Sequence, residues 1–405
     1  MSEWKEVQLN ETCNLIAGYA FKSKDFGNYP TKVLKIADIN PPFVSSEKSS
    51  GVDLSNYDVD KLDKYIVKKG DYILAMTGAT IGKLGRYVSD EHAYLNQRVL
   101  KFQPYQSIDS NFLYYVLCGR LFAKYIINHI DSESAQPNIS AGTIGKYRFN
   151  LPDFKTQQEI ASILSSLDSK IENNCKICAN LEAQAQALFK HWFIDFAPFK
   201  DGKFVESELG MIPEGWRVGT LGDVSSFISR GLSPKYQPGT NEMVLGQTCV
   251  RNNIVTLDNA REHNPKQNTD KRVQKWDVLL NSTGIGSLGR VGVVYFDDNN
   301  VCFDSHLTVV RSRQESFRYY LGRNLLSRQK EIENMAVGST GQTELPKKDV
   351  LVMPILIPSD CSLASFNILI DDIGNEMYSL LRENRRLSTL RDTLLPKLMS
   401  GEIKV

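Results

Sequence analysis

Residues 71–86 read Asp-Tyr-Ile-Leu-Ala-Met-Thr-Gly-Ala-Thr-Ile-Gly-Lys-Leu-Gly-Arg, and a related stretch returns later in the chain. Residues 277–290 read Asp-Val-Leu-Leu-Asn-Ser-Thr-Gly-Ile-Gly-Ser-Leu-Gly-Arg. An offset of 206 residues relates the two stretches and also aligns Gln136 with Gln342. Twice this offset is close to the full length of 405 residues. We therefore interpret the sequence as two diverged copies of one unit.

Each copy changes its hydrophobic pattern at a proline, Pro152 or Pro358. Before the proline, short β-rich runs alternate with Gly, Asn and Asp turns, and one helix is expected over 111–127 or 316–331. After it, apolar residues recur alternately every four and three positions, which is the heptad pattern of a coiled coil. A helix of about 40 residues rises roughly 60 Å, far longer than ordinary globular helices.

The heptad pattern defines one apolar seam on each predicted helix. The first seam contains Ile160, Leu164, Leu167, Ile171, Asn174, Cys178, Leu181, Ala185, Leu188 and Trp192. The second contains Phe366, Ile370, Ile373, Met377, Leu380, Asn384, Leu387, Arg391, Leu394 and Leu398. The two seam asparagines, Asn174 and Asn384, are not equivalent in the repeat, and a buried seam Asn can fix register and orientation. Two helices of an ordinary bundle are the alternative, but neither helix has another partner of matching length.

The elements follow in the order globule, helix, globule, helix. The two helices can pair most easily in this order if they run antiparallel, with one globule at each end. We predict a mixed α/β fold with two pseudo-twofold-related globular domains separated by two long antiparallel coiled-coil helices. The predicted boundaries are 1–152 for the first domain, 153–199 for the first helix, 211–358 for the second domain and 359–405 for the second helix.

Composition excludes several classes of protein. The 48 Lys and Arg residues balance the 47 Asp and Glu residues, giving a net charge of +1. This excludes a polybasic protein that binds phosphate through bulk charge, so any nucleic-acid binding must be local. We find neither an apolar run of roughly 18 residues nor a signal sequence after Met1, and we read the seven cysteines as reduced thiols. We therefore expect a cytoplasmic protein without membrane contacts.

Several motifs resemble catalytic sites. The tetrapeptide Asn40-Pro-Pro-Phe43 is one that adenine-N6 methyltransferases use, but no Gly-rich cofactor turn precedes it. The glycines at 284, 286 and 289 are followed by a strand-like run rather than the helix that a dinucleotide site needs, which favours a loop. Asp168 and Lys170 would face different sides of a helix, so we expect a solvated helix face there.

Metal and nucleophile patterns are equally weak in the sequence. The Cys175-x-x-Cys178 pair lies mid-helix without a second Cys or His pair at metal spacing. The five histidines stand in no known catalytic context. We therefore predict no catalytic residues and no metal ligands, and interpret the chain as a recognition protein.

One known family combines these features in this order. The stretch Gly18-Tyr-Ala-Phe-Lys-Ser-Lys-Asp-Phe26, the loop at 71–86, Gln136-Pro-Asn-Ile139, and Leu151-Pro152 with Gln157-Gln-Glu-Ile160 before a long helix resemble the specificity subunit of type I restriction-modification systems. The resemblance spans nearly the whole chain and includes its duplication. The second copy departs from the family at Pro358-Ser-Asp-Cys-Ser362, where the Gln-rich turn is missing.

The resemblance implies a function for each part. Each globule would be a target-recognition domain that reads one half of a bipartite, asymmetric site on double-stranded DNA, and the helices would set the spacer and dock the methyltransferase subunits. Two methyltransferase subunits and the motor-nuclease subunits would be the partners. They would supply S-adenosylmethionine, ATP and Mg, and this chain would be non-catalytic and hold no cofactor. The alternatives are an adenine-N6 methyltransferase that uses Asn40-Pro-Pro-Phe43 and a non-catalytic tethering protein.

Base reading needs side chains that reach the edges of the bases. Arg favours guanine, whereas Gln and Asn favour adenine. Our candidates are Thr77, Lys83, Arg86, Gln97 and Arg98 in the first domain and Arg251, Thr283, Arg290 and His306 in the second.

Overall fold

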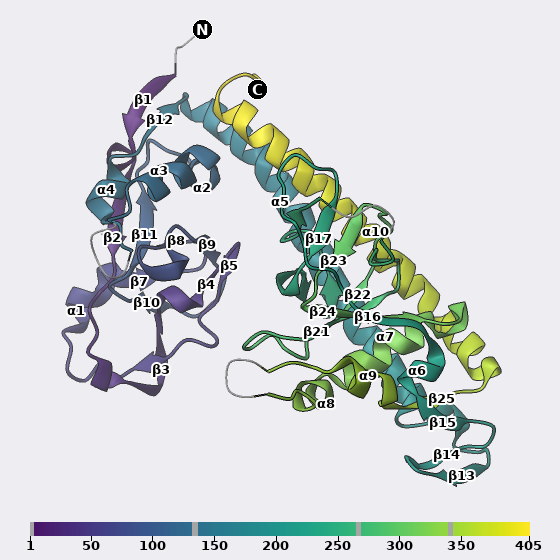
Figure 1. The fold of residues 1–405 in the computed structure, drawn as a ribbon. Helices are drawn as coiled ribbons and strands as arrows, with labels where there is room; N and C mark the ends of the chain where they lie inside the picture. Colours follow the sequence, from purple (N-terminus) through teal and green to yellow (C-terminus); the bar gives the residue numbers. More distant parts are fainter. Residues whose placement is uncertain (1–3, 132–136, 265–268, 339–342) are drawn as a thin grey trace. The chain divides into compact units, whose positions relative to one another are not determined.

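The computed structural model describes residues 4–131, 137–264, 269–338 and 343–405 (Figure 1). Two compact units make up the chain. The first consists of Met1–Lys170 and Arg386–Val405, and the second of Ile171–Arg385. Each contains one mixed α/β globule and part of both long helices, which confirms the predicted fold class. The aligned Gln136 and Gln342 lie outside the described residues.

The described residues of the first globule form three sheets. A six-stranded sheet has the order β2-β11-β8-β9-β5-β4, a four-stranded sheet has the order β6-β3-β10-β7, and β1 pairs with β12. The strands are β1 Lys5–Gln8, β2 Cys13–Ala17, β3 Phe26–Leu34, β4 Ile39–Asn40, β5 Phe43–Val44, β6 Gly51–Val52, β7 Ile66–Val67, β8 Tyr72–Ala75, β9 Leu84–Tyr87, β10 Ala93–Leu95, β11 Val99–Pro104 and β12 Arg148–Leu151. The helices are α1 Val59–Leu62, α2 Ser110–Cys118, α3 Arg120–Asn128 and α4 Ala141–Gly145.

The second globule repeats this topology. Its six-stranded sheet has the order β16-β24-β21-β22-β19-β18, its three-stranded sheet has the order β20-β17-β23, and β15 pairs with β25. A small additional sheet pairs β13 Phe204–Ser207 with β14 Gly210–Pro213. The remaining strands are β15 Arg217–Thr220, β16 Ser225–Arg230, β17 Met243–Leu245, β18 Val250–Arg251, β19 Ile254–Val255, β20 Arg261–Glu262, β21 Val278–Asn281, β22 Val291–Val294, β23 Val301–Phe303, β24 Leu307–Ser312 and β25 Pro354–Ile357. The helices are α6 Leu221–Val224, α7 Arg318–Ser327, α8 Gln329–Asn334 and α9 Lys347–Val352.

The single helix expected in each globule is broken into two. In the first globule Gly119 separates α2 from α3, because its ψ of 144° is extended rather than helical. In the second, Arg328 separates α7 from α8 at φ −108° and ψ 16°, and its guanidinium donates to the carbonyl of Pro354 over 2.6 Å. The apolar periodicity runs through both breaks, so the sequence pattern could not locate them.

Two helices of 40 residues each, α5 Phe154–Phe193 and α10 Asp360–Met399, run antiparallel within each unit. In the first unit Ile160 and Leu164 of α5 share a buried cluster with Leu394 and Leu398 of α10. In the second, Trp192 lies 6.0 Å from Phe366 between ring centroids. Reading the second seam in reverse therefore matches the seam residues that meet within each unit.

The two seam asparagines meet in this pairing. Asn174 is fully buried, and its Nδ2 donates to Oδ1 of Asn384 over 2.9 Å and to Glu383 over 2.6 Å. Antiparallel pairing thus explains why the two positions are not equivalent in the repeat. Of the other candidate seam residues, Met377 is buried, and Leu181, Leu188, Ile373 and Leu394 pack partly buried against the cores. Leu167, Ile171 and Leu387 are half-buried.

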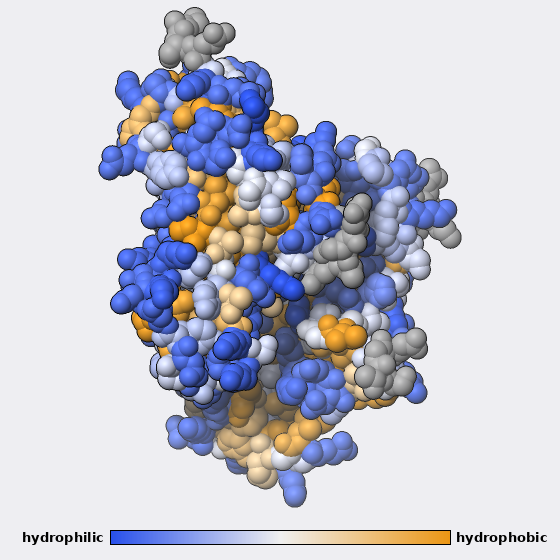
Figure 2. All heavy atoms as spheres, turned by 90° about the vertical axis from the view of Figure 1, so that its left-hand side faces the viewer, coloured by the Kyte–Doolittle hydropathy of each residue, from blue (hydrophilic) through white to orange (hydrophobic). Residues whose placement is uncertain are grey.

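The surface is hydrophilic over most of the face in Figure 2, with apolar atoms in scattered patches. Among the described residues, none of the helices is both long enough and apolar enough to span a membrane.

Candidate nucleic-acid interface

The same backbone arrangement positions the candidate residues in both globules. In the first, the amide of Met76 donates to the carbonyl of Arg98, and Thr77 forms a backbone bridge with Asn138. In the second, the amide of Ser282 donates to the carbonyl of His306, and Thr283 forms a bridge with Glu344. Arg98 and His306 therefore occupy the same place, as do Asn138 and Glu344.

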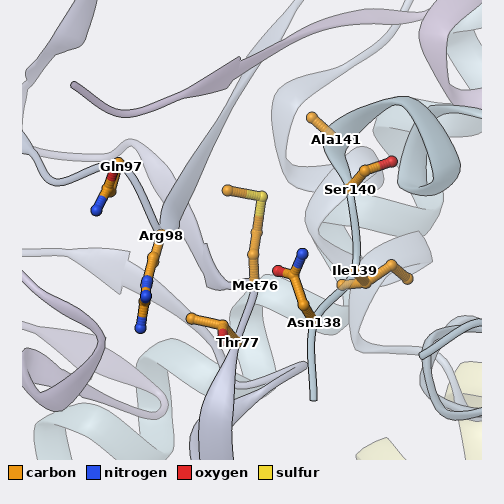
Figure 3. A pocket seen from close by; sticks show the side chains of 8 residues that line it. All are labelled: Met76, Thr77, Gln97, Arg98, Asn138, Ile139, Ser140 and Ala141. Atoms are coloured by element: carbon orange, nitrogen blue, oxygen red, sulfur yellow. The ribbon is translucent and has the colours of Figure 1, made fainter. Parts of the chain in front are cut away.

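In the first globule this arrangement forms an open pocket of about 460 Å³. Figure 3 shows Gln97 and Arg98 on one side and residues 138–141 on the other, with Met76 and Thr77 between them. The lining residues are Met76, Thr77, Gln97, Arg98, Asn138, Ile139, Ser140 and Ala141. The structure thus brings together three predicted candidates, Thr77, Gln97 and Arg98.

The exposed groups at this pocket have the chemistry of base reading. Gln97, Arg98 and Asn138 are exposed and carry two amides and a guanidinium, which match the acceptor and donor edges of adenine and guanine. Thr77 differs, because it is only 3% exposed and its hydroxyl donates to the carbonyl of Pro137 over 3.0 Å. The structure therefore gives Thr77 a role in holding the loop at Pro137 and Asn138.

The other two candidates of the first domain lie on β9 and before it. Lys83 is exposed, and its carbonyl accepts from Ala75. Arg86 is half-buried, with its guanidinium carbon 5.8 Å from the centroid of the Phe43 ring. Neither residue lines the pocket. Because Lys83 is exposed away from it, a contact with a DNA phosphate fits Lys83 better than a contact with a base.

In the second globule, hydrogen bonds tie the candidates to one another. The hydroxyl of Thr283 lies 2.8 Å from Nδ1 of His306 and 2.7 Å from Nε2 of Gln247. The amide of His306 donates to Oδ1 of Asp304 over 2.9 Å. Asp304 is buried, and this burial raises the pKa of its carboxyl. His306 is exposed above this network, which fixes the orientation of its ring.

The two arginine candidates of the second domain lie in different settings. Arg290 donates to the carbonyl of Gly286 over 2.9 Å and so braces the glycine loop between β21 and β22. Gly284, Gly286 and Gly289 all have positive φ in this loop, which confirms the loop interpretation. Arg251 is exposed at the end of edge strand β18.

Sequence reasoning missed Asn138, Ser140 and Gln247 at these sites. Asn138 was visible only as part of the Gln-Pro-Asn-Ile motif, because its bridge to Thr77 joins segments about sixty positions apart. Gln247 comes from the 3-10 turn Gln247–Cys249, which carried no signal in the sequence.

Two of the discounted motifs have structural roles. Asn40 and Phe43 pair across the β4–β5 hairpin at the edge of the six-stranded sheet, with the two prolines in the turn. The expectation of a solvated helix face holds for Lys170, which is exposed, but Asp168 is half-buried and hydrogen-bonded. Tyr115 donates to Asp168 over 2.7 Å and Arg391 over 2.8 Å, so this carboxylate joins α2 to both long helices within the first unit.

One family of known proteins matches both copies of the repeat. The family model described as "Type I restriction modification DNA specificity domain" matches residues 1–183 and again 213–361. Together these segments cover most of the chain, so the chain belongs to this family.

Two relatives match over nearly their full length. The type I restriction enzyme MjaIX specificity subunit of Methanocaldococcus jannaschii is 28% identical, with 95% of this chain and 96% of the relative covered. The HindI specificity subunit of Haemophilus influenzae is 26% identical, with 100% of both chains covered. A crystal structure of a type I restriction-modification S subunit from M. genitalium aligns with a TM-score of 0.52 at 15% identity over 98% of this chain and 96% of the other. At that identity the likeness shows the fold.

Proposed function

We propose that this chain is the DNA sequence-recognition subunit of a type I restriction-modification complex. Each globule is a target-recognition domain that reads one half of a bipartite, asymmetric site on double-stranded DNA. Membership of the specificity family, matched once in each copy, is the observation that carries this proposal.

The pocket of the first domain supports local base reading. Gln97 and Arg98 directly precede β11 and Asn138 is bridged to Thr77, and these exposed side chains can form bidentate contacts with adenine or guanine, each worth about 1–3 kcal/mol of discrimination. Two such sites on one chain gain affinity through effective concentration. A net charge of +1 is compatible with this mode, because partner subunits can add phosphate contacts.

The paired helices α5 and α10 are proposed to set the spacer between the half-sites and to dock two methyltransferase subunits. Exposed apolar residues on these helices, among them Ile163, Ile177, Ile368 and Leu369, offer contact area for a partner. The methyltransferase subunits would carry S-adenosylmethionine, and restriction subunits would use ATP and Mg. The chain itself would be non-catalytic and would work in the cytoplasm.

The spacer proposal has a direct length test. One heptad inserted into each helix adds roughly 10 Å, which is about three base pairs of DNA. We expect methylation mapping to show a longer gap between unchanged half-sites. Altered half-site bases would contradict this role of the helices.

Mapping of adenine methylation tests the function itself. Cells that express the methyltransferase subunits with this chain should carry one bipartite methylated motif, and cells that lack the chain should not. An unchanged methylation pattern without the chain would refute the proposal.

Two alternatives predict other results. An adenine-N6 methyltransferase using Asn40-Pro-Pro-Phe43 would bind S-adenosylmethionine as an isolated chain, and calorimetry without binding heat would exclude it. A tethering protein would give no sequence-dependent protection of DNA even with its partners present.

A further inference from the structure

Three residues from separate segments of the second unit bring metal-binding atoms together. Glu242 precedes β17, His263 follows β20 and Cys302 lies in β23. A carboxylate oxygen, a ring nitrogen and the thiol sulfur lie within 4.8 Å of one another. Zn²⁺ accepts all three ligand types. We propose that the second globule binds one Zn²⁺ ion through Glu242, His263 and Cys302, which goes beyond its proposed role in recognising DNA.

The environment of His263 points to a bound ligand. Its side chain is 0% exposed, and within the described residues neither Nδ1 nor Nε2 has a hydrogen-bond partner. An unsatisfied buried polar group costs roughly 1–3 kcal/mol. A metal ion bound to one ring nitrogen removes part of this cost and explains why an imidazole is retained inside the globule.

Glu242 is already oriented for such a role. Arg272 donates to its Oε2 over 2.7 Å and to its Oε1 over 3.2 Å. Each carboxylate oxygen has a second lone pair that remains open to a metal, and metal-binding carboxylates are commonly hydrogen-bonded in this way. The backbone of Arg272 also forms a bridge with that of Cys302, so the two residues hold one another in place.

Cys302 supplies the sulfur. Its side chain is fully buried. When zinc binds, the S–H bond breaks, the proton is released to solvent and the Zn–S bond forms. With a water molecule as its fourth ligand, tetrahedral zinc with bonds of roughly 2.0–2.3 Å separates its ligand atoms by roughly 3.3–3.8 Å. The three side chains would therefore contract around the ion by about 1 Å.

The first globule provides an internal comparison. In its matching sheet β3 pairs with β10 as β17 pairs with β23, so Tyr94 occupies the place of Cys302. By the same register Thr31 and Val52 take the places of Glu242 and His263. Val52 and Tyr94 belong to an apolar cluster. The first copy thus has two packed apolar side chains and a threonine at these places, where the second has the three proposed ligands.

The sequence alone predicted no metal ligands, because the three residues are far apart and lack the short spacings of common zinc motifs. Only the pairing of β17 with β20 and β23 brings them together.

Metal content of the full chain tests this site. The protein is stripped with a chelator, incubated with Zn²⁺, desalted and assayed by mass spectrometry for zinc. We expect one equivalent in the wild type and at least about tenfold weaker binding in His263→Gln and Cys302→Ser. The matched control is Cys249→Ser, which changes another buried cysteine of the same unit and should retain the ion. A wild type without zinc, or equal retention by Cys302→Ser, would overturn the proposal.

Co²⁺ binding to the wild type tests the site without relying on variants that could fail to fold. We expect a thiolate-to-cobalt charge-transfer band together with the absorption of tetrahedral cobalt. Binding of Co²⁺ without a thiolate band would also overturn the proposal. Neither result depends on DNA recognition.

Discussion

The two globules share one backbone arrangement but present different side chains at the same places. Where the first offers Arg98 and Asn138 at its pocket, the second offers His306 and Glu344. Glu344 is paired with Arg230 over 3.1 Å, whereas Asn138 is exposed at its pocket. A ladder of backbone hydrogen bonds can be kept while the side chains above it vary, which is the arrangement that reading two different half-sites requires.

The attachment of each globule to the long helices differs as well. In the first unit Asp168 of α5 accepts from Tyr115 and pairs with Arg391, and both members of the ion pair are about 30% exposed. In the second, the buried Arg323 contacts Glu182 of α5 and Tyr295. Water screens the first pair but is excluded from the second, so the two attachments differ in the free energy lost when one partner is removed.

The largest effect is therefore expected for Glu182→Gln. This change removes the negative charge that faces the buried Arg323 guanidinium. The free energy of unfolding should fall by roughly 3–5 kcal/mol, because a buried charge is left unpaired. Chemical denaturation of the full chain measures it. The control Glu159→Gln removes an exposed pair with Lys155 on the same helix and should cost about 1 kcal/mol or less. Equal effects of the two changes would show that the Arg323 contact is not a major attachment.

Base discrimination gives the next effect. Arg98→Ala should lose roughly 1–3 kcal/mol of discrimination at one base of one half-site, because a bidentate guanidinium contact disappears. Methylation rates on a library of singly substituted target DNA, with the partner subunits present, measure this loss. His306→Ala is the matched change in the other globule and should alter only the other half-site. An effect of Arg98→Ala in both halves would contradict separate reading.

The Asn174–Asn384 contact should give a smaller coupling. A double-mutant cycle with Asn174→Leu and Asn384→Leu should show an interaction of about 1 kcal/mol, because each single change removes the hydrogen bond between the two amides, one fully buried and the other half-buried. Urea denaturation of the four proteins measures the coupling. Additive changes would mean that the asparagines do not stabilise one another.

The smallest effect on stability is expected for Asp304→Asn. Asp304 holds the same backbone position as Asn96 of the first copy, so this change gives the second copy the residue of the first. Burial raises the pKa of Asp304 above its unfolded value of roughly 3.9, so the folded chain binds this proton more tightly. The wild type is then destabilised relative to the variant as pH rises through the folded pKa. We expect the variant to be more stable near pH 7 and the difference to shrink at acid pH. A difference that does not vary with pH would exclude this cause.

Much of the fold could be predicted because its signals are periodic. We could recognise three such features from the order of residues alone: the repeat, the heptads after Pro152 and Pro358, and the glycine loop near Gly284. The helix breaks at Gly119 and Arg328 could not be seen, because apolar spacing continues through them. The meeting of Asn174 with Asn384 needed the antiparallel register, which neither helix encodes alone.

The candidate site was harder to predict because its residues come together through strand pairing. Thr77, Gln97 and Arg98 line one pocket, whereas Asn138 reaches it only through a bridge between distant segments. The sequence suggested a reading role for Thr77, but its hydroxyl holds the loop at Pro137. Residue type indicates which chemistry is available, and only the fold decides which groups remain exposed.

Exchange of one domain tests the central claim most directly. Residues 1–152 are replaced by the matching segment of another member of the family, and the methylated motif is mapped in cells that contain the methyltransferase subunits. If each globule reads its own half-site, one half of the motif changes while the other half keeps its bases. A change in the bases of both halves would contradict independent reading by the two domains.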